Sequence, residues 1–239
     1  MSHLSNLARA AIAASAITIS AAPAANAALT CVSGACTETV SLGATATEIN
    51  ANMLFPLFDS TIGTLTSVSV QVTATLNALG SSFVQNNAGT SQTFLVKQSA
   101  DFTISATAGP TSGALNTALG ALALGPTTGF KSFTIGAGGT AAFGPFSPTS
   151  SATLTSPLAA FQTAGGGDDT IHISTISGTS ISGGGGNILA SISTTGDLSF
   201  NITYNYTVPE VGVPEPASLA LLGAGLAGIG WARRRKAKV

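Results

Sequence analysis

The residues with the most reactive side chains in this sequence are few and far apart. Beyond residue 27 the chain contains one histidine, His172, in the segment TIHIS. If this segment is a strand, Ile171 and Ile173 point to one face and the imidazole between them points to the other, away from the apolar face. A Ser-His-Asp arrangement needs a nucleophile and an orienting acid around the histidine, and the chain has no G-x-S-x-G turn to present such a serine. The sequence therefore predicts a surface histidine, no catalytic residues and no enzymatic activity.

Two adjacent acids, Asp168 and Asp169, follow a glycine run in AGGGDDTIHI. The segment resembles one calcium-binding nonapeptide, G-G-x-G-x-D-x-U-x, with Ala164 in place of the first glycine. One copy cannot build the stacked turns that hold calcium in such repeats, and two carboxylates supply only part of the oxygen shell that calcium needs. We therefore expect a glycine-rich hairpin loop, keep the two aspartates as a weak calcium candidate, and predict no cofactor.

The cysteines, Cys31 and Cys36, form one close pair in CVSGAC. In an exported chain an even, close pair of cysteines favours a disulfide. In the chain-entropy model, closing so short a loop raises the free energy of unfolding by about 2 kcal/mol at best. The spacing is not that of a redox-active C-x-x-C motif, and no histidine lies near enough in sequence to complete a metal site. A Cys31–Cys36 disulfide is expected, with free thiols as the alternative.

Charge is distributed unevenly along the chain, whose net charge is −1. Residues 28–213 contain two basic residues, Lys97 and Lys131, and eight acidic residues. In residues 214–239, by contrast, five of the six charged residues are basic. Residues 28–213 form the body of the chain. With only two lysines, the body cannot neutralise a phosphate backbone, so nucleic-acid binding is not expected.

Apolar and polar residues alternate through residues 37–208. The cleanest run is 198–208, and residues 68–76 and 94–104 follow the same pattern. A period of two predicts strands with one buried face, and clusters of glycine, proline and asparagine separate them. The predicted fold class is all-β: a single antiparallel β-sandwich or jelly-roll-like domain over residues 28–208.

Helical signal in the body is limited to two short stretches. Leu115, Leu119 and Leu122 have helical spacing. In SPLAAFQ, Ser156 would be the N-cap and Pro157 the first helical residue.

The first 27 residues have the pattern of a secretory signal peptide. Arg9 precedes an apolar run over residues 10–22, which is too short to span a membrane, and Ala25-Asn-Ala27 closes the segment with small residues. We expect signal peptidase, acting with the general secretion machinery, to cut between Ala27 and Ala28.

The chain ends with VPEPASLALLGAGLAGIGWARRRKAKV. Proline restricts its own backbone and that of the residue before it, so Pro214, Glu215 and Pro216 are expected to be extended, as a protease cleft requires. The apolar run over residues 217–232 predicts a transmembrane helix, and the basic cluster behind it marks the cytoplasmic side. That cluster consists of Arg233, Arg234, Arg235 and Lys236.

This order of motif, apolar helix and basic tail resembles a PEP-CTERM sorting signal over residues 214–239, preceded by a linker over 209–213. The resemblance implies recognition by an exosortase, a membrane transpeptidase-like cysteine protease that cuts near the motif. It also implies a Gram-negative host that makes exopolysaccharide. The precursor would be held in the inner membrane by its C-terminal helix, and the product would reach the cell envelope or extracellular matrix.

The body is similar to the domains called choice-of-anchor E, which directly precede such tails. The similarity rests on LFPLFDSTIGTLTSVSVQVTATL, LTSPLAAFQTAGG and GGNILASISTTGDLSFNITYNYTVPE. That family has no established catalytic activity. We therefore expect an exported structural protein of the cell surface or exopolysaccharide matrix, with a carbohydrate-binding or adhesive module and an uncleaved membrane-anchored protein as the alternatives.

Overall fold

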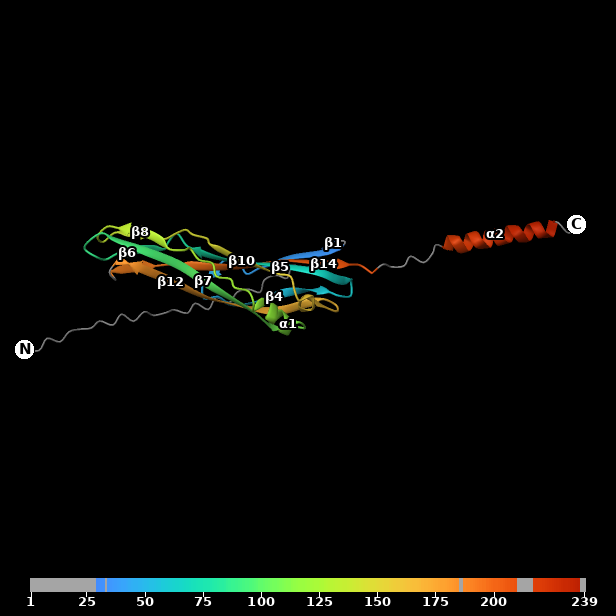
Figure 1. The fold of residues 1–239 in the computed structure, drawn as a ribbon, viewed down its shortest axis with the longest axis horizontal. Helices are drawn as coiled ribbons and strands as arrows, with labels where there is room; N and C mark the ends of the chain where they lie inside the picture. Colours follow the sequence, from blue (N-terminus) through green and yellow to red (C-terminus); the bar gives the residue numbers. More distant parts are fainter. Residues whose placement is uncertain (1–28, 33, 185–186, 210–216, 237–239) are drawn as a thin grey trace, which may run out of the picture.

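The structure, a computed structural model, describes residues 29–32, 34–184, 187–209 and 217–236, most of which lie in β-strands (Figure 1). The strands are β1 Thr30–Val32, β2 Ala35–Ser41, β3 Thr45–Ala46, β4 Asn50–Asp59, β5 Thr64–Ala78, β6 Phe83–Asn86, β7 Gln92–Ala108, β8 Lys131–Ile135, β9 Thr140–Ala142, β10 Thr149–Leu154, β11 Gln162–Thr163, β12 Gly167–Gly183, β13 Ile188–Ser191 and β14 Thr194–Thr207. The helices are α1 Ser112–Leu119, the 3-10 helix η1 Leu158–Phe161 and α2 Ala217–Lys236.

The alternating runs of the sequence form β5, β7 and β14. In β14 the side chains of Phe200, Ile202 and Tyr204 are buried on one face. Asn201 and Asn205 are exposed on the other face. Period-two alternation places one set of side chains in the core and the other in solvent. The prediction of a chain built from antiparallel β-sheets is confirmed.

Three sheets are formed by the described strands. One has the order β1-β2-β14-β5-β10, with β3 also pairing with β14; the second has the order β11-β4-β12-β7-β8; and the third has the order β13-β6-β9. Every pairing is antiparallel except the short parallel contact between β11 and β4. The long strand β12 pairs with β7 from Thr170 to Gly183 but with β4 only from Gly167 to Ser174.

The first two sheets face each other across the main hydrophobic core, which makes this part of the body a sandwich. Phe55 of β4 and Phe200 of β14 meet edge to face, with ring centroids 5.9 Å apart, and Phe161 of η1 packs on Phe55 at 6.1 Å. Leu115 and Leu119 of α1 are buried against the same cluster. Helix α1 therefore contributes its apolar face to the main core.

A second, smaller core lies toward the end of the body occupied by β6 and β8 (Figure 1). Phe94 and Val96 of β7, Val84 of β6 and Phe143 are buried within it. The sequence predicts a single sandwich, whereas β7 and β12, each 17 residues long, extend beyond the main core and require a second buried surface. The third sheet, β13-β6-β9, supplies strands for this second core.

Tyr204 joins the two main sheets through a buried hydrogen bond. Its hydroxyl donates to the carbonyl oxygen of Pro56 at 2.8 Å, and burial, followed by the nearby charge of Asp169, raises the pKa of Tyr204 so that the hydroxyl stays protonated. Replacing Tyr204 by phenylalanine leaves that carbonyl without its donor, so we expect a loss of about 1–2 kcal/mol in the free energy of unfolding. Denaturant titration measures the loss. Tyr206→Phe is the matched control, and an equal loss there would contradict the assignment.

The two short helices differ from their predictions in detail. Helix α1 ends at Leu119, so Leu122 lies beyond it. The stretch after Ser156 forms the 3-10 helix η1, and Pro157 has an extended backbone and occupies the cap position. Ser156 is therefore not the N-cap, because the helix begins one residue later than expected.

Helix α2 forms over the tail, with Arg233–Lys236 in its last turn. Among the described residues, no helix is long and apolar enough to cross a membrane. The transmembrane helix predicted for the tail is thus not confirmed. The apolar run ends at Ala232 after sixteen residues, which at about 1.5 Å per residue reach roughly 24 Å of a hydrocarbon core about 30 Å thick.

Candidate functional site

His172 lies on the outer face of β12, as its position between two buried isoleucines predicts. Its Nδ1 is 3.0 Å from Oδ1 of Asn52, the residue directly opposite on β4. This partner is an amide, not a nucleophile or an orienting carboxylate. The contact joins the imidazole to the neighbouring strand on the outer face of the sheet.

The two aspartates considered for calcium point to opposite sides of β12. Asp168 is exposed and Asp169 is fully buried, because neighbouring residues of a strand alternate between its faces. The two carboxylates therefore lie on opposite faces of the strand, and the weak calcium candidate stays a prediction. Among the described residues, no group of three or more histidine, cysteine, aspartate or glutamate side chains is arranged to hold a metal ion.

Asp169 has a structural role instead. Its Oδ2 accepts a hydrogen bond from Oγ1 of Thr111 at 2.8 Å, and its Oδ1 accepts one from the backbone nitrogen of Thr111 at 3.3 Å. Thr111 Oγ1 also lies 2.9 Å from the carbonyl oxygen of Ala160, which is part of η1. Gly109 has φ +126°, and a Cβ there would overlap the Asp169 carboxylate. The aspartate thus fixes the start of α1 against β12.

Asp59, the last residue of β4, closes the turn that follows this strand. Its Oδ1 accepts hydrogen bonds from the Thr61 hydroxyl at 2.7 Å, the Thr61 backbone nitrogen at 2.8 Å and the Gly165 backbone nitrogen at 2.9 Å. These donors, the Thr61 hydroxyl first, lower the pKa of Asp59. The bond to Gly165 ties the turn to the loop that precedes β12.

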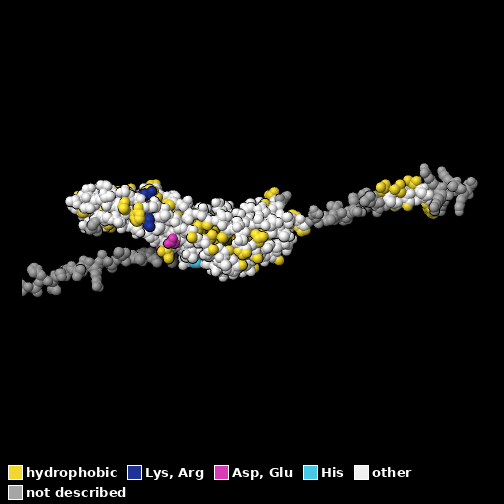
Figure 2. Space-filling model, in the orientation of Figure 1, with side chains coloured by type: hydrophobic (Ala, Val, Ile, Leu, Met, Phe, Trp, Pro, Cys, Tyr) yellow, Lys and Arg dark blue, Asp and Glu magenta, His cyan; other side chains and the backbone are white. Residues whose placement is uncertain are grey.

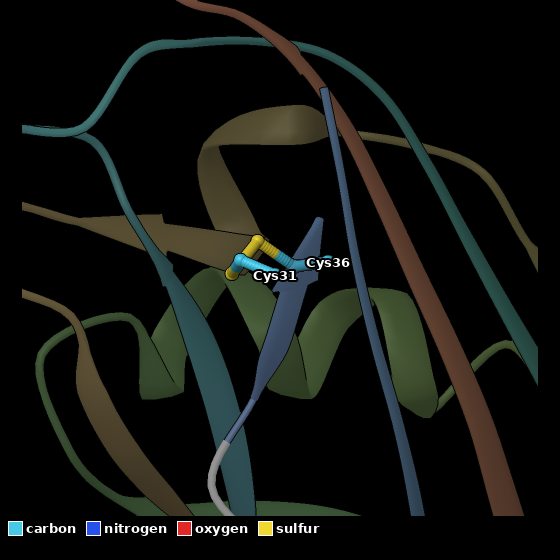
Figure 3. Close-up of a disulfide and its surroundings, with 2 residues drawn as sticks. All are labelled: Cys31 and Cys36. Carbon is cyan, nitrogen blue, oxygen red and sulfur yellow. A yellow bond between two sulfur atoms is a disulfide. The ribbon is translucent and has the colours of Figure 1, made fainter. Parts of the chain in front are cut away.

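Cys31 and Cys36 are joined by a disulfide with a Cα–Cα distance of 4.0 Å (Figure 3). The two residues lie directly opposite each other in the β1–β2 hairpin, whose turn contains Gly34 at φ +90°. Both cysteines line a pocket of about 380 Å³ between the hairpin and the facing strands β4 and β12. Leu29, Phe58, Asp59 and Asp168 line it as well.

Glu38 is the acid that sequence reasoning missed. It lies on β2 with Cys36 and Val40 on the same parity, so it faces inward and is only 7% exposed. Its Oε1 has no hydrogen-bond partner within the described part of the chain. Burial, followed by the charge of Asp168, raises the pKa of Glu38. The sequence contains one signal for this burial: Glu38 occupies a position in the alternating pattern of β2 where an apolar residue is expected.

The residues of the two predicted processing sites lie outside the described residues. These are Ala25, Ala27 and Ala28 at the N-terminal end and Pro214, Glu215 and Pro216 at the C-terminal end.

Comparison with protein families identifies a PEP-CTERM protein-sorting motif at residues 212–236. No curated protein matches the chain. Among solved structures, the chain is similar at 11% identity to one described as "Structure of infectious bursal disease virus Gx strain", with a TM-score of 0.20, over 81% of this chain and 48% of that one. The chain spans about half the length of that protein, and a TM-score this low supports no argument.

The matched segment contains the VPEP sequence followed by helix α2, which ends with the basic cluster. The chain therefore carries a PEP-CTERM sorting motif at its C-terminal end, which implies an exported, cell-surface-associated protein that is processed by an exosortase.

Proposed function

We propose that this protein is a structural component of the cell surface or of an exopolysaccharide matrix, delivered there by its sorting motif and released from its tail by an exosortase. The observation that carries the proposal is the match of residues 212–236 to the PEP-CTERM motif. The resemblance of the body to choice-of-anchor E domains, a family without established catalysis, also supports it.

The surface of the body suits a hydrated polysaccharide network. Figure 2 shows it to be largely neutral, with few basic or acidic side chains on the visible face. On the outer face of β14, Asn201 accepts a hydrogen bond from Thr39, and Asn205 donates one to Ser67. Hydroxyl and amide groups of this kind exchange hydrogen bonds with water and with sugar hydroxyls, without strong electrostatic attraction to any one partner.

The proposal includes no enzymatic activity. The candidate chemical groups in the described body are separated and engaged in structural contacts: His172 with Asn52, Asp169 with Thr111, and Asp59 with Thr61. Hydrolytic sites bring a base, a nucleophile and a stabilising group together. These side chains are better explained as supports of loops and strand ends.

The proposal is tested by intact mass and fractionation in the native host. We expect a chain that begins at Ala28, ends near Pro216 and is recovered with the exopolysaccharide fraction. A host that lacks the exosortase is the matched control, in which the recovered chain should keep residues 217–239. A processed chain that is absent from the polysaccharide fraction and found free in the medium would contradict the matrix role.

A further inference from the structure

The second half of β12 has a paired strand on one side only. Pairing with β4 ends at Ser174, whereas pairing with β7 continues to Gly183. Figure 1 shows this half of β12 running toward the end of the body that holds β6 and β8. Within the described part of the chain, no strand pairs with its other side. This half of the strand is therefore an open sheet edge.

A hydrogen bond at the start of this edge shows which backbone groups point outward. The Ser177 backbone nitrogen donates to Oε1 of Glu48, just before β4, at 3.0 Å. In an antiparallel ladder, alternate residues direct their backbone groups to the same side, and Thr179 and Ile181 follow Ser177 at that spacing in an unbroken register with β7. Among the described residues, no group bonds to the outward backbone of Thr179 or Ile181.

The edge lacks the features that usually prevent pairing between sheet edges. Natural edge strands are protected by charged side chains, by proline or by short length. The strands at the two ends of this sheet follow that rule, because β11 has two residues and β8 begins with Lys131. Residues 175–183 contain no charged residue and no proline, and residues 178–183 are exposed. Such an edge favours the addition of another strand.

Ile181 shows what an added strand would cover. Its side chain is 38% exposed, and it lies opposite Val96, which is fully buried in the second core. Directly opposed residues of a ladder share one face, so Ile181 lies at the rim of that core. A strand beside it would extend the core and remove apolar surface from water, which is favourable.

We propose that β12 pairs with β12 of a second copy of this chain, in an antiparallel ladder with Ser180 opposite Ser180. Glu48 occupies the position beside Ser177, where its Oε1 accepts hydrogen bonds from the backbone nitrogen and the hydroxyl. Gly178 is therefore the first residue that a new strand can reach. Ser180 is the centre of residues 178–182, which gives the register.

This register matches the outward backbone groups of the two copies. Thr179 of one copy lies opposite Ile181 of the other, and Ile181 of the first lies opposite Thr179 of the second. Both residues direct their backbone groups outward, so each of these pairs exchanges both of its backbone hydrogen bonds. Ser180 directs its backbone groups toward β7, so the central pair brings two side chains together without backbone hydrogen bonds.

Self-complementarity favours a second copy as the partner. An identical antiparallel edge presents donors and acceptors at matching positions, and a two-fold contact uses the same surface on both molecules, so it closes at a dimer. Charge does not oppose the contact. At about 3.3 Å per residue, Ser177 and the adjacent Glu48 of one copy lie roughly 20 Å along the ladder from those of the other. This separation exceeds the screening length of about 8 Å at physiological salt.

The register is tested by a cysteine at its centre. Cys31 and Cys36, the only cysteines of the chain, are bonded to each other, so Ser180→Cys adds a single free thiol. Opposed residues without backbone hydrogen bonds have Cα atoms about 4.5 Å apart, within the range of a disulfide. We expect a covalent dimer to form rapidly when the chain recovered from its host is oxidised with copper phenanthroline.

Gln71→Cys is the matched control for this cross-link. Gln71 is an exposed residue of β5, and it is paired with β14 on one side and β10 on the other. Its covalent dimer should form at least about tenfold more slowly, because reactants held in the right geometry react far faster than those that must collide. Equal rates for the two variants would overturn the proposed contact.

A second measurement uses the parent chain and needs no new thiol. In sedimentation equilibrium, the mass should rise with concentration toward twice that of one chain. Ser180→Lys places like charges directly opposite each other and should raise the dissociation constant about tenfold or more, whereas Gln71→Lys should leave it unchanged. A single-chain mass at every concentration, or an open series of larger assemblies, would overturn the inference. Neither result would bear on sorting by the C-terminal tail.

Discussion

Replacing Pro214, Glu215 and Pro216 together by alanine is expected to stop processing of the tail, so that the chain recovered from the host still contains residues 217–239. Helix α2 begins at Ala217, directly after the second proline. Proline disfavours helix at its own position and at the residue before it, whereas alanine is the best helix former. The substitution therefore removes the motif and also favours extension of α2 through the position of cleavage.

Intact mass of the chain from the cell envelope and the culture medium measures this outcome. Glu210→Ala is the matched control, since Glu210 is an acid just upstream that lies outside the matched residues 212–236. The control should be processed as the parent chain is. Normal processing of the triple-alanine chain would show that the protease does not read these three residues.

Phe200→Ala is expected to destabilise the body by about 3–5 kcal/mol, the usual result of removing a buried aromatic ring. Phe200 is fully buried at the centre of the sandwich and packs edge to face on Phe55. Few neighbours can move to fill the space, because the surrounding side chains come from strands paired on both edges, such as β14, β5 and β12. The midpoint of denaturant unfolding should fall sharply.

Phe130→Ala provides the comparison for this prediction. Phe130 is 55% exposed and contacts Lys97 through its ring. Its loss should lower the free energy of unfolding by no more than about 1 kcal/mol, in the range of an exposed cation–π contact. Similar losses for the two variants would mean that Phe200 does not contribute to the core as its burial indicates.

The strands whose side chains form the main core were predictable because apolar and polar residues alternate along them without interruption. From Leu198 to Tyr204 every second residue is apolar and every one of these is buried. Such a period identifies a strand and its buried face but not its partners. The division into three sheets depends instead on how far β7 and β12 extend beyond β4, which no local pattern encodes.

The chemistry of the body was predicted less well, for a physical reason. Adjacent aspartates look like a pair in the sequence, yet Asp168 and Asp169 lie on opposite faces of one strand. Glu38 is only 7% exposed, and the charge that acts on it belongs to Asp168, a residue distant in sequence. The sorting motif was predictable because its information is contained in one continuous segment.

The scarcity of lysine has a consequence for the fate of the protein outside the cell. Trypsin-like proteases cut after lysine or arginine, and from Ala28 to Ala232 the chain offers them Lys97 and Lys131 alone. Lys97 lies within β7 and pairs with Ser180 of β12, and Lys131 begins β8 opposite Val96. A protease of this specificity would have to open the sheet before it could cut at Lys97. The folded body should therefore persist in a shared extracellular space, and a complete tryptic digest of residues 28–232 would yield few fragments.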